Sequence, residues 1–356
     1  MGGTGQGRKG SRMITIHYPL FREKLSQLAA VIPVRSTLPQ LSCVKMSASE
    51  QRLLLEATNL EQWLSVKLPA DGSIEPFCVD LARVRVIPAS GDAKLVESAG
   101  NLKIEASGIR ATIQTLPATE FPVSPTLDSS IQPVPFDDIR INENLEWVNK
   151  ASSSEESRYA LMGVHMEGGM MVASNGHLFL SAACPDLGAS ITIPKSCIPT
   201  MTSIPAMDRV ISTDGNRVEL SNKETRFITS LIDSGFPNWQ PLVAHQTAGD
   251  YTEWHFDSAA MIKALKDSSS LWRSTPASTV RLRGNEDGIE LESGGQEAST
   301  VMEVAGSGGP QWMCNGNYLL AMLSGFEGDV EMRVYSGCSK IEQDGRMALV
   351  VHQILK

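Results

Sequence analysis

The sequence IQTLPATEFP at residues 113–122 returns in a related form as ITSLIDSGFP at residues 228–237. The two copies start 115 residues apart, because the first begins at 113 and the second at 228. A second pair of segments, ATN…LS in 57–65 and ASN…LS in 173–181, is separated by 116 residues. Two unrelated segments with almost the same offset predict a duplicated domain. If the folded part of this 356-residue chain begins at Met13, it can hold three units of about 115 residues, an ordinary domain size.

Composition places the chain among globular proteins, with 42% hydrophobic and 20% charged residues. No apolar run approaches the roughly 18 residues of a membrane span. Residues 1–12 are rich in glycine and contain three basic residues, but they lack the apolar centre of a signal peptide. We therefore expect residues 1–12 to be a tag or a disordered arm.

The formal net charge of −9 is acidic, whereas nucleic-acid-binding proteins are usually basic. This argues modestly against tight DNA binding, although a local basic stripe can exist on an acidic protein. The six cysteines lie far apart and form no C-x-x-C pair. They predict buried thiols in a reducing cytoplasm and no zinc site.

Helical patterns recur about every 60 residues, two in each predicted unit. They cover residues 20–31, 77–86, 145–150, 194–201, 259–271 and 318–326. Alternating β-branched segments lie between them, with hairpin turns expected at Asp214-Gly215 and at 285–288. The predicted unit is α+β, with two helices on one face of its sheets. Linkers at 122–135 and 245–251 give predicted domains 13–128, 129–245 and 246–356.

No catalytic or cofactor-binding constellation is evident. The six histidines are scattered without the i, i+4 spacing of a helical metal pair, and the serine run 152–154 reads as a loop. We therefore expect no enzyme activity, no cofactor and no metal. Asn175-Gly176-His177 predicts a tight hairpin turn, and its histidine is either a simple surface residue or part of the rim of a binding site.

Six motifs occur in a defined order and resemble one family closely. They are STLPQL at 36–41, ATNLE at 57–61, TLPATEFP at 115–122, RYALMG at 158–163, ASNGH at 173–177 and LIDSGFP at 231–237. Together they resemble the bacterial sliding clamp, the β subunit of DNA polymerase III. The segment 315–320 also matches that family's asparagine-x-x-tyrosine helix start. The resemblance runs from about Met13 to the last residue.

This resemblance implies three tandem DNA-clamp domains in a head-to-tail homodimeric ring around duplex DNA. Helices would line the hole and antiparallel sheets would form the outside. Such a ring is a non-catalytic processivity factor in DNA replication, holding DNA topologically through weak, sequence-independent phosphate contacts. Its partners would be DNA polymerase and the clamp loader, bound through short peptides. The positions that match inward-facing basic residues of the family are Arg35, Arg83 and Lys195.

The resemblance also implies a partner-peptide pocket between the second and third domains. Its predicted walls are Leu161, Ser174, Gly176, His177, Leu178, Phe179, Pro237, Leu242, Val350, Val351 and Ile354. The family usually has arginine-leucine where this chain has Leu178-Phe179. The segments 238–241 and 352–356 also depart from the family pattern. We expect a more apolar groove with altered peptide preference, and a C-terminal strand within 348–355 whose end rims it.

Dimerisation is expected to join the first domain of one chain to the third of the other. Leu271 and Trp272 match the family's interface position and form an apolar pair at the end of a predicted helix. A core role for the tryptophan is the alternative. An alternative for the whole chain is a tandem α+β protein-binding scaffold that never encircles DNA.

Overall fold

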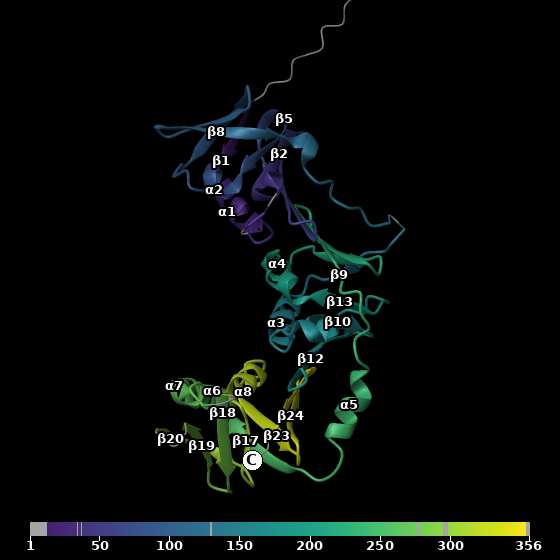
Figure 1. Ribbon diagram of the computed structural model, residues 1–356, viewed down its shortest axis with the longest axis vertical. Coiled ribbons are helices and arrows are strands. Elements are labelled where there is room, and N and C mark those ends of the chain that lie inside the picture. Colours follow the sequence, from purple (N-terminus) through teal and green to yellow (C-terminus); the bar gives the residue numbers. More distant parts are fainter. Residues whose placement is uncertain are drawn as a thin grey trace, which may run out of the picture. The chain divides into compact units, whose positions relative to one another are not determined.

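The structure, a computed structural model, describes residues 13–33, 35–36, 38–128, 130–275, 278–294 and 298–353. It divides into two compact units (Figure 1). The first unit extends to Asp137 and also contains Pro199–Ser230. The second contains Asp138–Ile198 and the chain from Leu231 onward. Residues 1–12, which were expected to be a tag or a disordered arm, lie outside the described residues.

The first unit is built on one antiparallel sheet with the strand order β1-β6-β7-β8-β5-β2-β3-β4-β16-β15-β14-β9. Helix α1 contacts β1, β3, β4 and α2, and therefore covers one side of this sheet. The elements are β1 (Met13–His17), α1 (Tyr18–Leu28), β2 (Cys43–Ser49), β3 (Arg52–Thr58), β4 (Gln62–Pro69), β5 (Asp71–Asp80), α2 (Leu81–Arg85), β6 (Asp92–Ser98), β7 (Asn101–Ala106), β8 (Ile109–Pro117), β9 (Val134–Pro135), α4 (Ile198–Ser203), β14 (Val210–Thr213), β15 (Arg217–Ser221) and β16 (Thr225–Ser230).

The second unit has two antiparallel sheets, ordered β13-β10-β11-β12-β25-β24-β23-β17-β21 and β20-β19-β18-β22. Its elements are α3 (Ile139–Asn149), β10 (Gly163–Glu167), β11 (Met170–Ser174), β12 (Leu178–Ala183), β13 (Ile191–Pro194), α5 (Trp239–Gln246), β17 (Thr252–Asp257), α6 (Ser258–Asp267), α7 (Ser269–Trp272), β18 (Thr279–Gly284), β19 (Ile289–Gly294), β20 (Ser299–Val304), β21 (Gly306–Ser307), β22 (Trp312–Asn315), α8 (Gly316–Leu323), β23 (Asp329–Val334), β24 (Cys338–Gln343) and β25 (Arg346–Val351).

The repeated ATN and ASN segments form equivalent hairpin turns. Asn59 Oδ1 accepts hydrogen bonds from the backbone N–H groups of Glu61 (3.0 Å) and Gln62 (2.7 Å). Asn175 Oδ1 accepts bonds from the N–H groups two and three residues further on, both at 2.9 Å. An asparagine side chain can satisfy a turn in this way because it replaces a backbone acceptor. The duplication seen in the sequence therefore reflects a repeated local structure.

Most predicted helices are present, and several begin with an acidic or amide cap. Asp80, Asp138, Asp257 and Asn315 each accept a bond from a backbone N–H in the first turn of α2, α3, α6 and α8, respectively. Part of the predicted helix 77–86 is wrong, because Phe77–Asp80 belongs to strand β5. Helix α5 was not predicted, and it occupies residues that were assigned to the segment before the second linker.

The two compact units do not follow the three predicted repeats. Strand β4, from the first predicted domain, pairs with β16 from the second, with Leu64 opposite Phe227. This pairing carries one sheet across the predicted boundary, so that β14–β16 cluster with the first repeat. The fold class of tandem α+β clamp domains fits the architecture, while the boundaries at 128 and 245 stay a prediction. Across the described residues, the helices are too short or too polar for a membrane span.

Candidate functional site

A largely apolar groove of about 250 Å³ lies in the second unit. Three separate segments form it: the turn between β11 and β12, the segment 236–246 that includes α5, and the end of β25. Its lining residues are Leu161, Ser174, Gly176, His177, Leu178, Phe179, Phe236, Pro237, Trp239, Leu242, Val243, Gln246, Leu349 and Val351. Among the described residues that line it, His177 is the only ionisable one. The groove therefore suits an apolar ligand segment rather than a charged one.

Strand pairing explains which residues of β25 reach the groove. Strand β12 pairs with β25 in a register that places Phe179 opposite Leu349 and Leu178 opposite Val350. Side chains alternate between the faces of a strand. Leu349 and Val351 line the groove, while Val350 is fully buried and faces away. Of the predicted wall residues on this strand, Val351 lines the groove and Val350 does not, and the predicted Ile354 lies outside the described residues.

The Asn175-Gly176 turn holds the mouth of the groove in shape. Gly176 has a φ of +86°, a left-handed conformation that glycine adopts readily. A Cβ atom added there would lie 2.6 Å from Nη1 of Arg158. That guanidinium donates to the backbone oxygen of Asn175 and pairs through Nε with Glu155 at 3.0 Å. Arg158, the cation beside the groove, is thus already paired with a carboxylate, and its bond to Asn175 supports the turn.

An aromatic wall next to α5 was missed in the sequence. Phe179 and Trp239 have ring centroids 5.3 Å apart, and both pack on a cluster that includes the buried Tyr335, Cys338 and Leu349. The sequence signal was present, since Phe236 and Trp239 flank the predicted Pro237. The signal for Leu349 was the alternation within the predicted C-terminal strand. The exposed His177 stacks on Tyr318 of α8 at 6.1 Å and so stands at the rim.

The predicted DNA-facing residues fall in different surroundings. Arg35 is exposed after α1, and Arg83 is exposed on α2. Lys195 is half-buried, and its Nζ donates to Ser152 O (3.1 Å) and to Ser154 Oγ (2.9 Å). Each of the two compact units therefore contains part of this predicted set.

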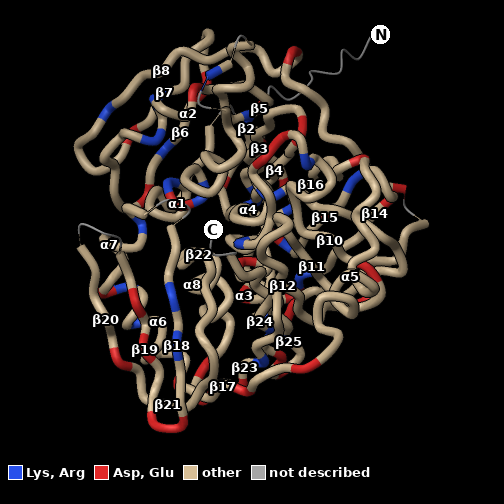
Figure 2. The backbone as a smooth tube through the Cα atoms, turned by 60° about the horizontal axis from the view of Figure 1, so that its bottom comes forward, with Lys and Arg blue, Asp and Glu red and all other residues tan. Residues whose placement is uncertain are grey.

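Several basic side chains of the strands are paired with carboxylates. Figure 2 shows basic positions on β18 beside acidic positions on β19, and Arg281 pairs with Glu292 at 3.0 Å. Lys45–Glu56 (2.8 Å) and Arg226–Glu219 (2.9 Å) are similar cross-strand pairs. In the described part of the chain, Arg22, Arg83, Arg85, Lys150 and Lys266 on or beside helices have no carboxylate within 4.0 Å. These helix-associated cations are more available to an external anion.

The predicted interface pair Leu271 and Trp272 requires a correction. Trp272 is completely buried, and its indole N–H donates to Leu265 O at 2.9 Å. Its ring also lies against Gly316, where a Cβ would approach within 2.9 Å. The tryptophan is therefore a core residue, not an exposed interface anchor. Leu271 is half-buried on α7 and remains accessible.

Burial of the thiols, predicted from the sequence, is found for five of the six cysteines. All six cysteines are free, five are buried, and Cys184 is half-buried. Burial raises the pKa of Cys338 to about 11 and that of Cys78 to about 12, which disfavours the reactive thiolate. Within the described ranges, no group of three potential metal-binding residues was found.

Comparison with solved structures defines the class of fold. DNA polymerase III subunit beta from Pseudomonas aeruginosa superposes with a TM-score of 0.83 at 20% identity, covering 96% of this chain and 100% of that one. The beta sliding clamp of Caulobacter crescentus gives 0.84 at 21% identity, with 97% and 100% coverage. The Thermotoga maritima beta subunit gives 0.82 at 19% identity, again with 97% and 100% coverage. The chain has the sliding-clamp fold.

Sequence comparison points to the same proteins. The beta sliding clamp of Caulobacter vibrioides is 29% identical over 315 residues, which cover 78% of this chain and 83% of the relative. That of Haemophilus influenzae is 23% identical over 305 residues, covering 79% and 80%. No family model matches the chain. The resemblance to the bacterial beta sliding clamp, predicted from six short motifs, is confirmed.

Proposed function

We propose that this chain is a DNA sliding clamp, a non-catalytic protein that encircles duplex DNA and tethers a DNA polymerase to it. The observation that carries the proposal is similarity to proteins named beta sliding clamp over 315 residues, on a chain with the same fold. Three domains, 13–128, 129–245 and 246–356, would form half of a six-domain ring. Such a protein tethers its partners to DNA without catalysing a reaction, and in this proposal it acts in the cytoplasm and needs no cofactor.

The apolar groove is proposed as the site for short peptides of the polymerase, the clamp loader and other replication or repair proteins. Support comes from its composition, since apolar and aromatic walls surround one rim histidine. A Pseudomonas aeruginosa clamp of the same fold was solved bound to griselimycin, which shows that a clamp of this kind takes a ligand. Leu178 stands where the family usually has arginine, and it is buried. Peptides with leucine or phenylalanine anchors suit these walls.

DNA contact is proposed to be weak and independent of sequence, through cations such as Arg35, Arg83 and Lys195. A closed ring does not need high affinity, because the DNA cannot leave through its wall. This reconciles the function with a net charge of −9. Phosphate contacts position a protein on duplex DNA without reading its sequence.

The test is retention on circular DNA. The protein is loaded onto a nicked circular plasmid by a clamp loader, and the complex is separated by gel filtration in about 0.2 M salt. We expect the protein to stay with the circle and to be lost when a restriction enzyme linearises the DNA. Equal retention on linear and circular DNA would contradict topological binding. If the protein is retained on neither circular nor linear DNA but still binds partner peptides, the result would favour the alternative of a protein-binding scaffold.

A further inference from the structure

A buried histidine lies directly behind one wall of the apolar groove. His165 on β10 is 6% exposed, and its ring stacks on that of Phe236 with centroids 4.5 Å apart and planes inclined by 5°. Phe236 lines the groove and packs on the cluster that contains Phe179. An imidazole therefore supports a phenyl ring that a bound peptide would contact. His165 was not among the site residues selected from the sequence.

Hydrogen bonds hold the imidazole and the start of the segment that carries Phe236. Nδ1 of His165 lies 3.0 Å from Oγ1 of Thr192, its partner on β13. The backbone oxygen of the same threonine accepts the N–H of Ile232 at 2.9 Å. Residues 233–235 are exposed and belong to no helix or strand. Beyond Ile232, the stack on His165 is therefore a contact that decides where Phe236 lies.

Few charges surround the imidazole. Its Nε2 lies 3.6 Å from Oε2 of Glu167 on the same strand, whose side chain is 55% exposed. Strands β11 and β13, which are described along their whole length, contain no titratable residue, and the described segment 231–237 contains only the exposed Asp233. Burial lowers the pKa of His165 below its usual 6.5, while Glu167 and the Ile191 backbone oppose the shift. The ring is therefore neutral at pH 7.

A proton on His165 is accommodated best when Phe236 moves away. A charged ring loses hydration when it is buried, so the proton binds more tightly to an arrangement that admits water. The strand that carries His165 is held by backbone ladders on both sides, whereas Phe236 lies on an irregular segment. Because linkage is reciprocal, binding of the proton favours displacement of Phe236.

We propose that His165 is a positioning residue of the apolar groove, which in its neutral form holds Phe236 in place for a peptide and on protonation releases it. This inference rests on the proposed function and adds control by pH to the same site. His165 does not line the groove, so it acts through Phe236. Peptide affinity should be full above pH 6.5 and should fall as the pH drops below that value.

The experiment is isothermal titration calorimetry with a short synthetic peptide that has leucine and phenylalanine anchors, blocked ends and no titratable side chain. Wild type is compared with His165→Phe, which keeps an aromatic stack on Phe236 but cannot titrate. At pH 7.5 the two affinities should agree within about twofold. Between pH 7.5 and 5.5 the wild type should lose at least about threefold more affinity than the variant. The rim residue His177 is present in both proteins and cancels.

Proton release gives a second reading of the same linkage. The peptide favours Phe236 in place, so binding at pH 5.5 should release more protons from the wild type than from His165→Phe. Titrations in two buffers with different ionisation enthalpies measure this difference. Equal proton release and equal pH profiles in the two proteins would overturn the proposal.

A double-mutant cycle tests whether His165 acts through Phe236. His165→Ala should weaken peptide binding about fivefold at pH 7.5 in the wild-type background, and should cost nothing further in a Phe236→Ala background. Equal losses in both backgrounds would assign a general structural role and overturn the proposal. If His165→Ala does not fold, the pH comparison with His165→Phe still decides between the two outcomes.

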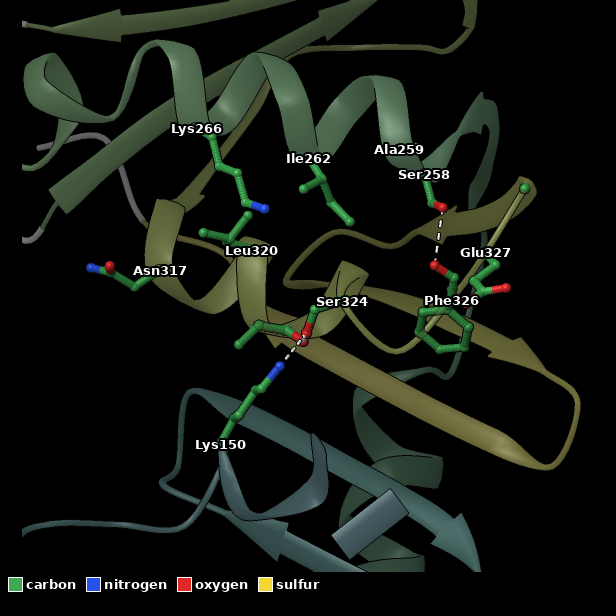
Figure 3. Close-up of a pocket in the computed structure, with 12 residues that line it drawn as sticks. Lys150, Ser258, Ala259, Ile262, Lys266, Asn317, Leu320, Ser324, Phe326 and Glu327 are labelled. Carbon is green, nitrogen blue, oxygen red and sulfur yellow. Dashed lines mark hydrogen bonds between the residues drawn. The ribbon is translucent and has the colours of Figure 1, made fainter. Parts of the chain in front are cut away.

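Ser258→Ala is the control for a general loss of stability in the same unit. The buried Ser258 donates to Phe326 O at 3.0 Å, and Figure 3 shows this bond among side chains that do not belong to the apolar groove. The variant should lower the urea midpoint and leave peptide affinity unchanged. A loss of affinity equal to that of His165→Ala would show that stability alone causes the effect, against the proposal.

Failure of this inference can be told apart from failure of the proposed function. Wild-type protein that binds the peptide at pH 7.5 but shares the pH profile of His165→Phe would overturn only the role of His165. Wild-type protein that binds no such peptide at either pH would count against the proposed use of the groove, and the role of His165 would fail with it.

Discussion

At the scale of single residues, His352 makes the stability of the second unit dependent on pH. Its ring stacks on Trp312 with centroids 4.7 Å apart, and Nε2 lies 2.8 Å from Ser339 Oγ. Burial lowers the pKa of His352 from 6.5 to about 4. Between these values the unfolded chain binds more protons than the folded one, so stability is lost as pH falls from 6.5 toward 4.

His352→Phe tests this dependence, because phenylalanine keeps the stack on Trp312 but cannot titrate. We expect the variant to be less stable by about 1 kcal/mol at pH 8, through the lost bond to Ser339. At pH 4.5 the deficit should shrink or reverse. Urea midpoints of both proteins at the two pH values provide the measurement. His165, whose pKa burial also lowers, is present in both proteins and cancels in the comparison. A deficit that does not change with pH would contradict the assignment.

Arg209 is a second residue with a large expected effect, because it is a buried cation that forms no ion pair with any residue that the structure describes. It is 1% exposed, and it donates to the backbone oxygens of Phe136 (2.8 Å), Ile204 (3.0 Å) and Met201 (3.4 Å). Burial lowers its pKa to about 10, with Asp137 opposing the shift, so it stays charged at neutral pH.

Arg209→Met should lower the free energy of unfolding of the first unit by about 3 kcal/mol, since buried carbonyl groups lose their donors. Arg52→Met is the matched control, because Arg52 is an exposed arginine on β3 of the same unit, and its effect should stay within about 0.5 kcal/mol. Chemical denaturation followed by fluorescence gives both values. Similar losses in the two variants would show that the backbone bonds of Arg209 contribute little.

At the scale of elements, the sequence was most informative where a local side chain determines the backbone. The turns at Asn175-Gly176 and Asp214-Gly215 were predictable, because their side chains bond to their own backbone. Helix α5 was not, since it contains Pro241 and buries no residue completely. Trp272 was misplaced because apolar periodicity does not distinguish a core position from an interface position. Val350 was misplaced because register, not composition, selects the face of a strand.

Helix α5 is expected to act through Trp239, which closes one side of the apolar groove. Trp239→Ala should weaken binding of a peptide with leucine and phenylalanine anchors more than tenfold, about 1.4 kcal/mol or more. The urea midpoint should change little, because the side chain is only half-buried. Trp63→Ala, a half-buried tryptophan on β4 of the other unit, is the control. Isothermal titration calorimetry measures the affinities, and equal binding by the two variants would exclude Trp239 from the site.

At the scale of the whole molecule, the offset of about 115 residues was readable in the sequence, but the compact units were not. They depend on the pairing of β4 with β16, between residues more than 150 positions apart. Such pairings follow from tertiary packing and leave no local signal. The groove likewise depends on strands β12 and β25 meeting, with Phe179 opposite Leu349. For that reason its individual segments were predicted from family resemblance rather than from spacing.

We expect the dimer to form between the edge strands of the two end domains. Strand β20 is a terminal strand of its sheet, and its Val301 is 56% exposed. Strand β8 pairs with β5 only over Thr115–Pro117, so its earlier residues present a second edge. Free edges of this kind tend to pair with another chain. Arg110 on β8 and Glu303 on β20 carry opposite charges, which favours a head-to-tail pairing over a symmetric one.

Val301→Lys should therefore convert a dimer into a folded monomer with half its mass, close to the 38.5 kDa of one chain. The lysine places a charge in the apolar centre of the interface, where desolvation costs several kcal/mol. Leu271→Asp on the adjacent α7 should act in the same direction, without the damage to the core that a change at Trp272 would cause. Light scattering after gel filtration at about 10 µM measures the mass, and circular dichroism checks the fold.

Val123→Lys, at a site that is 90% exposed, is the control and should stay dimeric. A dimer that survives both Val301→Lys and Leu271→Asp would show that the chains meet through another surface.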